Sequence, residues 1–411
     1  MWAQISINGF WSARSIYTGI VILFHLGLVV YPILNLDLRV SDAPMEWLTL
    51  PAGPRAIWTS SLGVLSMSLA CILVYAQPRS GEPALPEYER ELRRVAPRLG
   101  SWTVVVSVAA WVYTTASAMG LGFFLASYGA YKSATIDLPM DYIFFGITMG
   151  MVLLGTTLDG VPKAALVAFV IFAVLGFPMG LRGEVLFPLV AYALMRARHH
   201  PMPRAGSLVV LVLIALFFIS GVKELRQTGW GDARDVLTSA NPIAGVGELG
   251  YTVRTVAEVD QWHQAGELPR NGATYWAPIE RLSNRLMPGA ENVAAKYDYR
   301  LMNVEMRSRA GNLGGSIIAE SFRNFGLTGV FVVMFLTGLL CAGIDVASTG
   351  AGRQLILGVF FVVLLQHVRN SFTPIPLQLL MGVMLVTVVI FIARSIASVS
   401  TDAPNRRAAR A

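Results

Sequence analysis

The sequence predicts an all-α, polytopic integral membrane protein with about ten transmembrane helices and one large external loop domain. Of its 411 residues, 55% are hydrophobic and only 14% are charged, against roughly 25% charged in an ordinary soluble domain. The mean hydropathy is +0.57, and apolar runs recur along almost the whole chain. These values exclude a soluble enzyme, a disordered scaffold and a nucleic-acid-binding protein, so nucleic acid is not an expected partner.

A spanning helix needs about 20 mostly apolar residues, and eight segments meet that requirement clearly. They are residues 15–34, 57–76, 101–124, 140–158, 206–221, 325–345, 355–368 and 374–393. Two further spans share residues 164–195, which are fewer than the roughly 40 residues that two full crossings require. We therefore expect a short hairpin whose apex lies below the outer membrane surface.

The basic residues predict the orientation of the chain in the membrane. Lys and Arg in short loops remain on the cytoplasmic side. Placing both termini inside puts 15 basic residues at inner loops and tails and five at outer short loops. We expect a multi-pass protein with both termini cytoplasmic.

Residues 223–323 interrupt the apolar pattern, with 12 basic and 12 acidic side chains in 101 residues. This composition predicts an extracytoplasmic loop domain between membrane domains at residues 1–222 and 324–396, with a basic cytoplasmic tail at 397–411. Within the loop, Val246, Leu249, Val253, Val256 and Val259 recur at helical spacing. They predict one amphipathic helix lying over the membrane.

Charged residues at the hairpin apex are the first candidates for chemistry. Arg182 and Glu184 lie there among the helix breakers Gly176, Pro178 and Pro188. An ionisable residue below the membrane surface is costly and is a functional candidate. A snorkelling Arg182 paired with a nearby carboxylate is the structural alternative, and a clamp for a diphosphate is the functional one.

Further basic residues are expected at the same outer level. Arg323 precedes the eighth span, Arg369 ends the ninth, and Lys223 and Arg226 follow the seventh. A guanidinium bonds two phosphate oxygens at once while remaining charged. Together these side chains predict a binding site for a lipid-linked anion, although each one separately could meet lipid headgroups or an acidic neighbour.

A general base is sought among the carboxylates and histidines near this level. Glu184 and Glu320 are the main candidates, and Glu248, His263 and His367 are the others. Because Glu320 lies one helical turn before Arg323, an ion pair within one helix is the structural alternative. His25, alone in the first span, is expected to be a hydrogen-bonded interior histidine.

The loop also contains Tyr275 and Trp276, which fit either an interfacial aromatic belt or a platform that stacks on sugars.

We expect no cofactor and no metal. The sequence has no zinc-ligand spacing, P-loop or dinucleotide-binding motif. Cys71 and Cys341 lie inside apolar runs, where neither a disulfide framework nor a cysteine-ligated metal is expected.

Three segments resemble the Wzy-type O-antigen and exopolysaccharide repeat-unit polymerases of bacterial membranes. They are Gly-Leu-Arg-Gly-Glu at 180–184, Gly-Ala-Thr-Tyr at 272–275 followed by Leu-Met-Pro at 286–288, and the segment 318–329 that opens the eighth span. The order of these segments, the many spans and the large late loop carry the resemblance from about residue 175 to 372. It implies a GT-C-like architecture.

The resemblance also implies an activity on the outer face of the cytoplasmic membrane. A growing glycan would move from undecaprenyl diphosphate to a newly flipped repeat unit, with a chain-length regulator protein as a further candidate partner. Arg182, Arg323 and Arg369 would stabilise the departing diphosphate, and one carboxylate would take the acceptor proton. A ligase that transfers finished glycan, a flippase for the same lipid-linked oligosaccharide, and a purely structural membrane protein remain open as alternatives.

Overall fold

The computed structural model confirms a helical, polytopic architecture. It describes residues 9–34, 39–40, 43–44, 46–74, 87–126, 128–157, 160–202, 242–287, 294–311, 313–346 and 350–408, together with Gly289 and a few positions between 212 and 221. Five described helices are long and apolar enough to cross a membrane: Ala13–Ile33, Ala52–Leu73, Glu87–Met119, Ile317–Val346 and Ile375–Ser398. Every predicted span coincides with a helix except 206–221, which lies largely outside the described residues.

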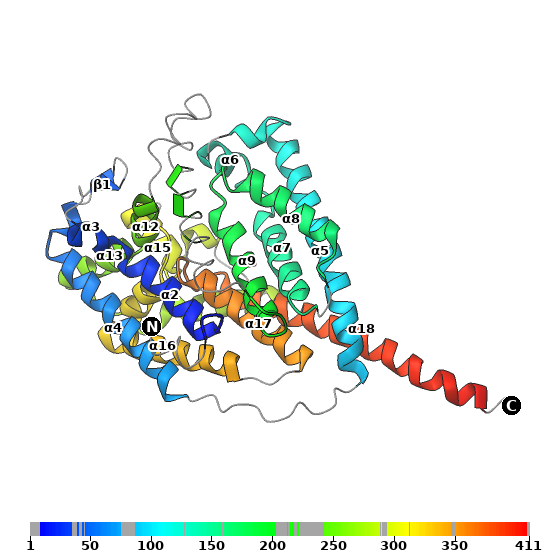
Figure 1. Ribbon diagram of the computed structural model, residues 1–411. Helices are drawn as coiled ribbons and strands as arrows, with labels where there is room; N and C mark the ends of the chain where they lie inside the picture. The colour runs from blue at the N-terminus through cyan, green and yellow to red at the C-terminus, as the bar shows by residue number, and fades with distance from the viewer. Residues whose placement is uncertain are drawn as a thin grey trace.

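The helices form two groups joined by α17 (Figure 1). The first group contains α2 (Ala13–Leu26), α3 (Val30–Ile33), α4 (Ala52–Leu73) and α16 (Ile317–Val346). The second contains α5 (Glu87–Met119), α7 (Met140–Leu154), α8 (Lys163–Gly176), α9 (Arg182–Arg196) and α18 (Ile375–Ala408). Helix α17 (Ala351–His367) contacts α16 in the first group and α9, α7, α5 and α18 in the second. Its fully buried Leu365 and Phe361 pack in the core of the first group, whereas Leu355 and Val359 pack in that of the second.

The hairpin of α8 and α9 has the predicted shortness. Its helices contain 14 and 15 residues, or about 21 and 22 Å at 1.5 Å per residue, against roughly 30 Å of hydrocarbon. The chain reverses through Gly180, whose φ of 90° a residue with a Cβ rarely adopts. Arg182 is therefore the first residue of α9, directly after the apex.

The segment after 241 contains α12 (Pro242–Gly250), α13 (Val253–Gln264), α14 (Ala273–Leu286) and α15 (Met302–Ala310). The predicted apolar stripe from Val246 to Val259 is divided between α12 and α13, which are separated at residues 251–252. The predicted single helix is thus two helices, and their apolar stripe packs into the same core as α2, α4 and α16. Its position over the membrane stays a prediction. Close packing of α12 on the 3₁₀ turn Gly27–Val29 requires glycine, since a Cβ added at Gly250 would lie 2.4 Å from the Leu28 nitrogen.

The remaining described elements are short connections. They are the 3₁₀ turns Gly27–Val29, Glu46–Leu48, Phe123–Leu125 and Ala295–Tyr297, helix α6 (Tyr128–Ala134), and the two-residue strands β1 (Arg39–Val40) and β2 (Ala43–Pro44). The strands pair antiparallel, with Arg39 opposite Pro44. Of these connections, α6 carries Lys132, whose charge acts on Glu184 of the site described below.

Candidate functional site

A kink in α16 sets the position of the candidate site. The helix has non-helical dihedral angles at Gly326, with φ 64° and ψ −155°. Glu320 and Arg323 lie on the short helical segment before this kink, and the long apolar part of the helix follows it. Ser316 caps the start of the segment, because its hydroxyl accepts hydrogen bonds from the backbone N–H groups of Ile318 and Ala319.

Glu320 is fully buried, and its carboxylate joins three parts of the chain. Its Oε1 accepts a hydrogen bond of 2.7 Å from the Thr274 hydroxyl on α14. Its Oε2 accepts one of 2.6 Å from the backbone N–H of Phe372, between α17 and α18, and lies 3.3 Å from His367 Nε2. We call Glu320, Thr274, His367 and Phe372 the Glu320 site.

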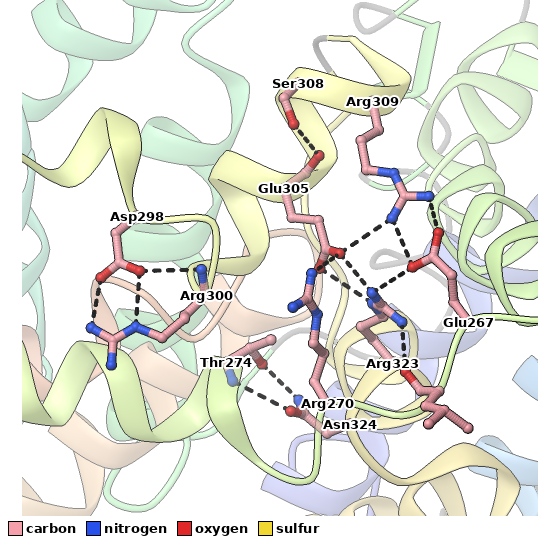
Figure 2. A network of polar contacts seen from close by, with 11 residues as sticks. Glu267, Arg270, Thr274, Asp298, Arg300, Glu305, Ser308, Arg309, Arg323 and Asn324 are labelled. Atoms are coloured by element: carbon pink, nitrogen blue, oxygen red, sulfur yellow. Dashed lines mark hydrogen bonds and ion pairs between the residues drawn. The ribbon is translucent and has the colours of Figure 1, made fainter.

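Asn324 completes the attachment of α14 to α16 (Figure 2). Its amide nitrogen donates to the Thr274 hydroxyl at 2.6 Å, and its amide oxygen accepts from the Thr274 N–H at 3.3 Å. The backbone N–H of Asn271 donates to the Asn324 carbonyl at 2.9 Å. Because the Thr274 hydroxyl donates to Glu320 and accepts from Asn324, all of these groups are oriented by one another.

Tyr275 lies beside the Glu320 site. Its hydroxyl lies 3.1 Å from Ser321 Oγ, and its ring stacks on Phe325 and meets Phe372 edge-on at a centroid distance of 5.2 Å. Burial raises the pKa of the Tyr275 phenol, and the Glu320 carboxylate raises it further. Trp276 is 62% exposed on another face of α14, so the structure does not bring the two predicted sugar-binding rings together.

Arg323 belongs to a separate arginine–carboxylate network, made of Glu267, Arg270, Glu305, Arg309 and Arg323 (Figure 2). Arg323 is buried and donates to Glu305 at 2.7 Å and to Glu267 at 2.8 Å. The intrahelical pair of Glu320 with Arg323, considered above as an alternative, is not formed. Burial acts to raise the pKa of Glu305, but Arg323 and Arg270 outweigh it and hold that pKa below its ordinary value.

Arg182 is buried at the start of α9 and forms an ion pair with Glu248 on α12. This pairing agrees with the structural alternative for the hairpin apex, in which Arg182 pairs with a nearby carboxylate. The carboxylate is Glu248, one of the candidates for the general base. Lys223 and Arg226 lie outside the described residues, so their predicted contribution to the anion site stays a prediction.

Arg369 lies in the 368–374 turn between α17 and α18 and is exposed. Within the described residues its guanidinium has no recorded hydrogen bond or ion pair. It lies close enough to Glu184, on the first turn of α9, for the two charges to interact electrostatically. The charges of Asp141 and Lys132 also act on Glu184, so this region gathers charged residues from spans that are far apart in the sequence.

The 368–374 turn is held on two sides. From one side, Glu320 accepts the Phe372 N–H. From the other, the backbone of Gly314 and Gly315 packs directly on the turn, where a Cβ added to Gly315 would lie 2.2 Å from the Ser371 nitrogen. The position of Arg369 therefore depends on residues about 50 positions earlier in the chain.

The two other histidines considered in the sequence lie outside the Glu320 site. His25 is fully buried, with Nε2 2.6 Å from Ser316 Oγ and Nδ1 3.1 Å from the Val21 carbonyl, which confirms it as a hydrogen-bonded interior residue. His263 stacks edge-on against Phe322 at 4.7 Å. Burial and the nearby Arg323 lower the pKa of His263.

Among the described residues, no group of three or more His, Cys, Asp or Glu could hold a metal ion.

Sequence reasoning did not identify the partners of these residues. Glu267 and Glu305 carry no motif, and only their long-range contacts with Arg323 reveal them. Thr274 was part of a segment used for the family resemblance, and its contact with Glu320 spans 46 positions. Gly315 and Asn324 had no signal that pointed to the 368–374 turn or to α14.

Comparison with known proteins places the chain among polysaccharide polymerases. A family profile described as O-antigen polysaccharide polymerase Wzy matches residues 5–398. The chain is also 28% identical over 258 residues to protein CapE of Staphylococcus aureus, a match that covers 62% of this chain. The matched part spans 57% of the length of that protein. No solved structure matches the chain.

Proposed function

This chain belongs to the O-antigen polysaccharide polymerase Wzy family, and we propose that it polymerises undecaprenyl-diphosphate-linked oligosaccharide repeat units at the outer face of the bacterial cytoplasmic membrane. The observation that carries the proposal is the exposed Arg369, whose charge acts on Glu184, on a turn that Glu320 and the Gly314–Gly315 backbone hold in place. Such a pair offers a fixed cation and a carboxylate at the end of a membrane helix bundle.

The proposed reaction needs both groups. The acceptor hydroxyl attacks the anomeric carbon of the donor glycan, the new glycosidic C–O bond forms, and the bond to the lipid diphosphate breaks. Negative charge develops on the departing diphosphate, and a fixed guanidinium stabilises it. The proton of the acceptor hydroxyl passes to a carboxylate. No nucleotide or ATP is consumed, because the donor carries its own leaving group.

Burial separates the roles of the two carboxylates. Both oxygens of Glu320 accept hydrogen bonds inside the protein and the residue is fully buried, so it is proposed as a positioning residue for the 368–374 turn. Glu184 is partly exposed beside Arg369, so it is the proposed base. Arg323 is proposed to position α14 and α15, because its guanidinium is held by Glu267 and Glu305.

Arg182 is proposed to act on the diphosphate site indirectly, through the position of the hairpin apex. It is buried two residues before Glu184 on α9, and its ion pair with Glu248 fixes the apex of the hairpin to α12. Because Glu248 balances the charge of Arg182, the proposed contribution of Arg182 is to hold the hairpin apex in place. Its replacement by lysine would keep the charge but lose the planar donor geometry.

The proposal is tested by deleting the gene in its host and sizing the surface polysaccharide on a gel. Loss of the ladder to a single repeat unit, with the ladder restored by the wild-type gene, would support polymerisation. Full-length glycan left on its carrier lipid would instead indicate a ligase, and accumulation of unflipped repeat units a flippase. Either of these two results, or an unchanged ladder in the deletion, would overturn the proposal.

A further inference from the structure

Helix α14 has two opposite faces, one buried and one apolar but exposed. Thr274, Ala277 and Arg281 are buried against the rest of the protein. On the opposite side, Trp276 is 62% exposed, Ile279 40% and Leu286 68%. The spacing of these three residues puts them on one narrow stripe of an α-helix. Met287, directly after the helix, is 59% exposed and extends the stripe.

The start of α14 is fixed at the level where α16 begins its long apolar part. The backbone N–H groups of Arg270 and Asn271 donate to the carbonyls of Arg323 and Asn324, at 3.0 and 2.9 Å. The kink at Gly326 follows immediately. After the kink, Leu327 is 54% exposed and Leu336 57%, as expected for the lipid-facing side of a spanning helix. The start of α14 thus lies beside the start of the long apolar part of α16.

We propose that α14 lies in the membrane interface, with the stripe of Trp276, Ile279 and Leu286 inserted among the lipids of the outer leaflet. An amphipathic helix with aromatic and aliphatic residues on one side is stable at that depth, and Trp prefers the headgroup level. In water the same stripe would leave three large apolar side chains exposed. The bilayer is the proposed occupant because α14 begins where the long apolar part of α16 begins.

This placement gives Trp276 a role that does not depend on the proposed reaction. Thr274, on the buried face of α14, bonds Glu320, so membrane insertion of the stripe also fixes the height of the Glu320 site relative to the lipid surface. The external segment is then not a free aqueous domain, because its α14 is part of the membrane-embedded surface.

Nitroxide labelling of the full chain in phospholipid vesicles tests the proposal. The two native cysteines are buried and are removed as Cys71→Ala and Cys341→Ala. Single labels are introduced by Trp276→Cys, Ile279→Cys and Leu286→Cys, with Leu336→Cys on the lipid-facing side of α16 and Arg307→Cys on exposed α15 as references. Power saturation then compares collisions with oxygen, which concentrates in lipid, and with a water-soluble nickel chelate.

We expect the three α14 labels to show the high ratio of oxygen to nickel collisions of the Leu336 label, well above that of the Arg307 label. A low ratio like that of Arg307 would place the stripe in water and overturn the proposal. Low collision with both reagents would mean that protein covers the stripe, which would overturn it as well. The three positions are measured in separate variants, so if one variant is not expressed the other two still test the proposal. None of these measurements requires polymerase activity.

Discussion

The two ends of α16 differ in the arginines near them, because the arginine at one end is buried and the one at the other is exposed. At its C-terminal end, Asp345 accepts hydrogen bonds from the backbone N–H groups of Ala13 and Arg14, at 2.7 and 3.1 Å, and pairs with the Arg14 side chain. The Arg14 guanidinium also donates to the carbonyls of Cys71 and Val74 at the end of α4. A buried arginine here satisfies the backbone groups that helix ends leave without partners.

At the N-terminal end of α16, the contacts of Glu320 position a turn that carries the exposed Arg369. Glu320 holds the backbone of the 368–374 turn, and Arg369 extends from that turn with its guanidinium accessible. Arg323 is an intermediate case, buried like Arg14 and fully engaged with Glu305 and Glu267. The comparison teaches that a buried arginine in an apolar sequence can serve packing alone, as Arg14 does, and that the accessible head group of Arg369 distinguishes it from Arg14.

The largest expected effect on stability is that of Arg14→Ala. Removing the guanidinium leaves Asp345 as a mostly buried carboxylate that has lost its countercharge, which costs about 3–5 kcal/mol. Thermal unfolding of the detergent-solubilised protein should show this loss, whereas Arg307→Ala on the exposed face of α15 should change stability by no more than about 0.5 kcal/mol. An equal change in thermal stability in the two variants would contradict the structural role of Arg14.

Replacing Glu320 by Gln should affect both folding and polymerisation. One oxygen becomes an NH₂ group that faces either the Phe372 N–H or the Thr274 hydroxyl, so a buried donor or acceptor is left unsatisfied at a cost of about 1–3 kcal/mol. We expect faster hydrogen exchange at residues 369–373 and shorter glycan chains. The matched control is Glu280→Gln, which changes a half-exposed carboxylate paired with Arg300. Unchanged exchange in the 368–374 turn would contradict the positioning role.

The kink before the long apolar part of α16 is tested by two glycine substitutions in one helix. A Cβ would meet nothing within 4 Å at either Gly326 or Gly343, so packing does not distinguish them. Gly326 has a φ of 64° that disfavours any residue with a Cβ, and Gly326→Ala should cost about 1–3 kcal/mol. Gly343→Ala should be neutral or slightly stabilising, because alanine favours the helix. Similar effects at the two sites would show that the kink is not required.

The smallest expected effect is the response of the arginine–carboxylate network to acid. Arg309 lowers the pKa of Glu267, and Arg323 and Arg270 outweigh burial to lower that of Glu305. A lowered carboxylate pKa stabilises the fold at pH values above the ordinary 4.5, and this contribution is lost as the pH falls below it. Hydrogen exchange of α13–α15 should therefore rise on acidification below about pH 4. Constant protection over that range would mean that the network adds no stability.

Hydropathy was enough to predict most of the membrane helices, because their apolar length is a local property of the sequence. It also predicted a short hairpin at 164–195, where α8 and α9 contain 14 and 15 residues. Contacts between distant segments were not predictable in the same way. The partner of Arg182 is Glu248, 66 positions away, and that of Glu320 is Thr274, 46 positions away.

The amphipathic helices show the same limit. The stripe from Val246 to Val259 and the stripe of Trp276, Ile279 and Leu286 both have helical spacing. The structure buries the first against α2, α4 and α16 and leaves the second exposed. Periodicity identifies an apolar face, but what covers that face is decided by tertiary packing.

The central claim is that Arg369 is the accessible cation of a polymerase site, and the most direct measurement is the length of the glycan made by Arg369→Ala at equal protein level. We expect the ladder to collapse toward a single repeat unit, a loss of about a hundredfold or more in rate, with thermal stability unchanged. Arg369→Lys should give a partial ladder, because the charge remains without the planar fork, and Arg307→Ala should give the full one. A wild-type ladder from Arg369→Ala would contradict the account.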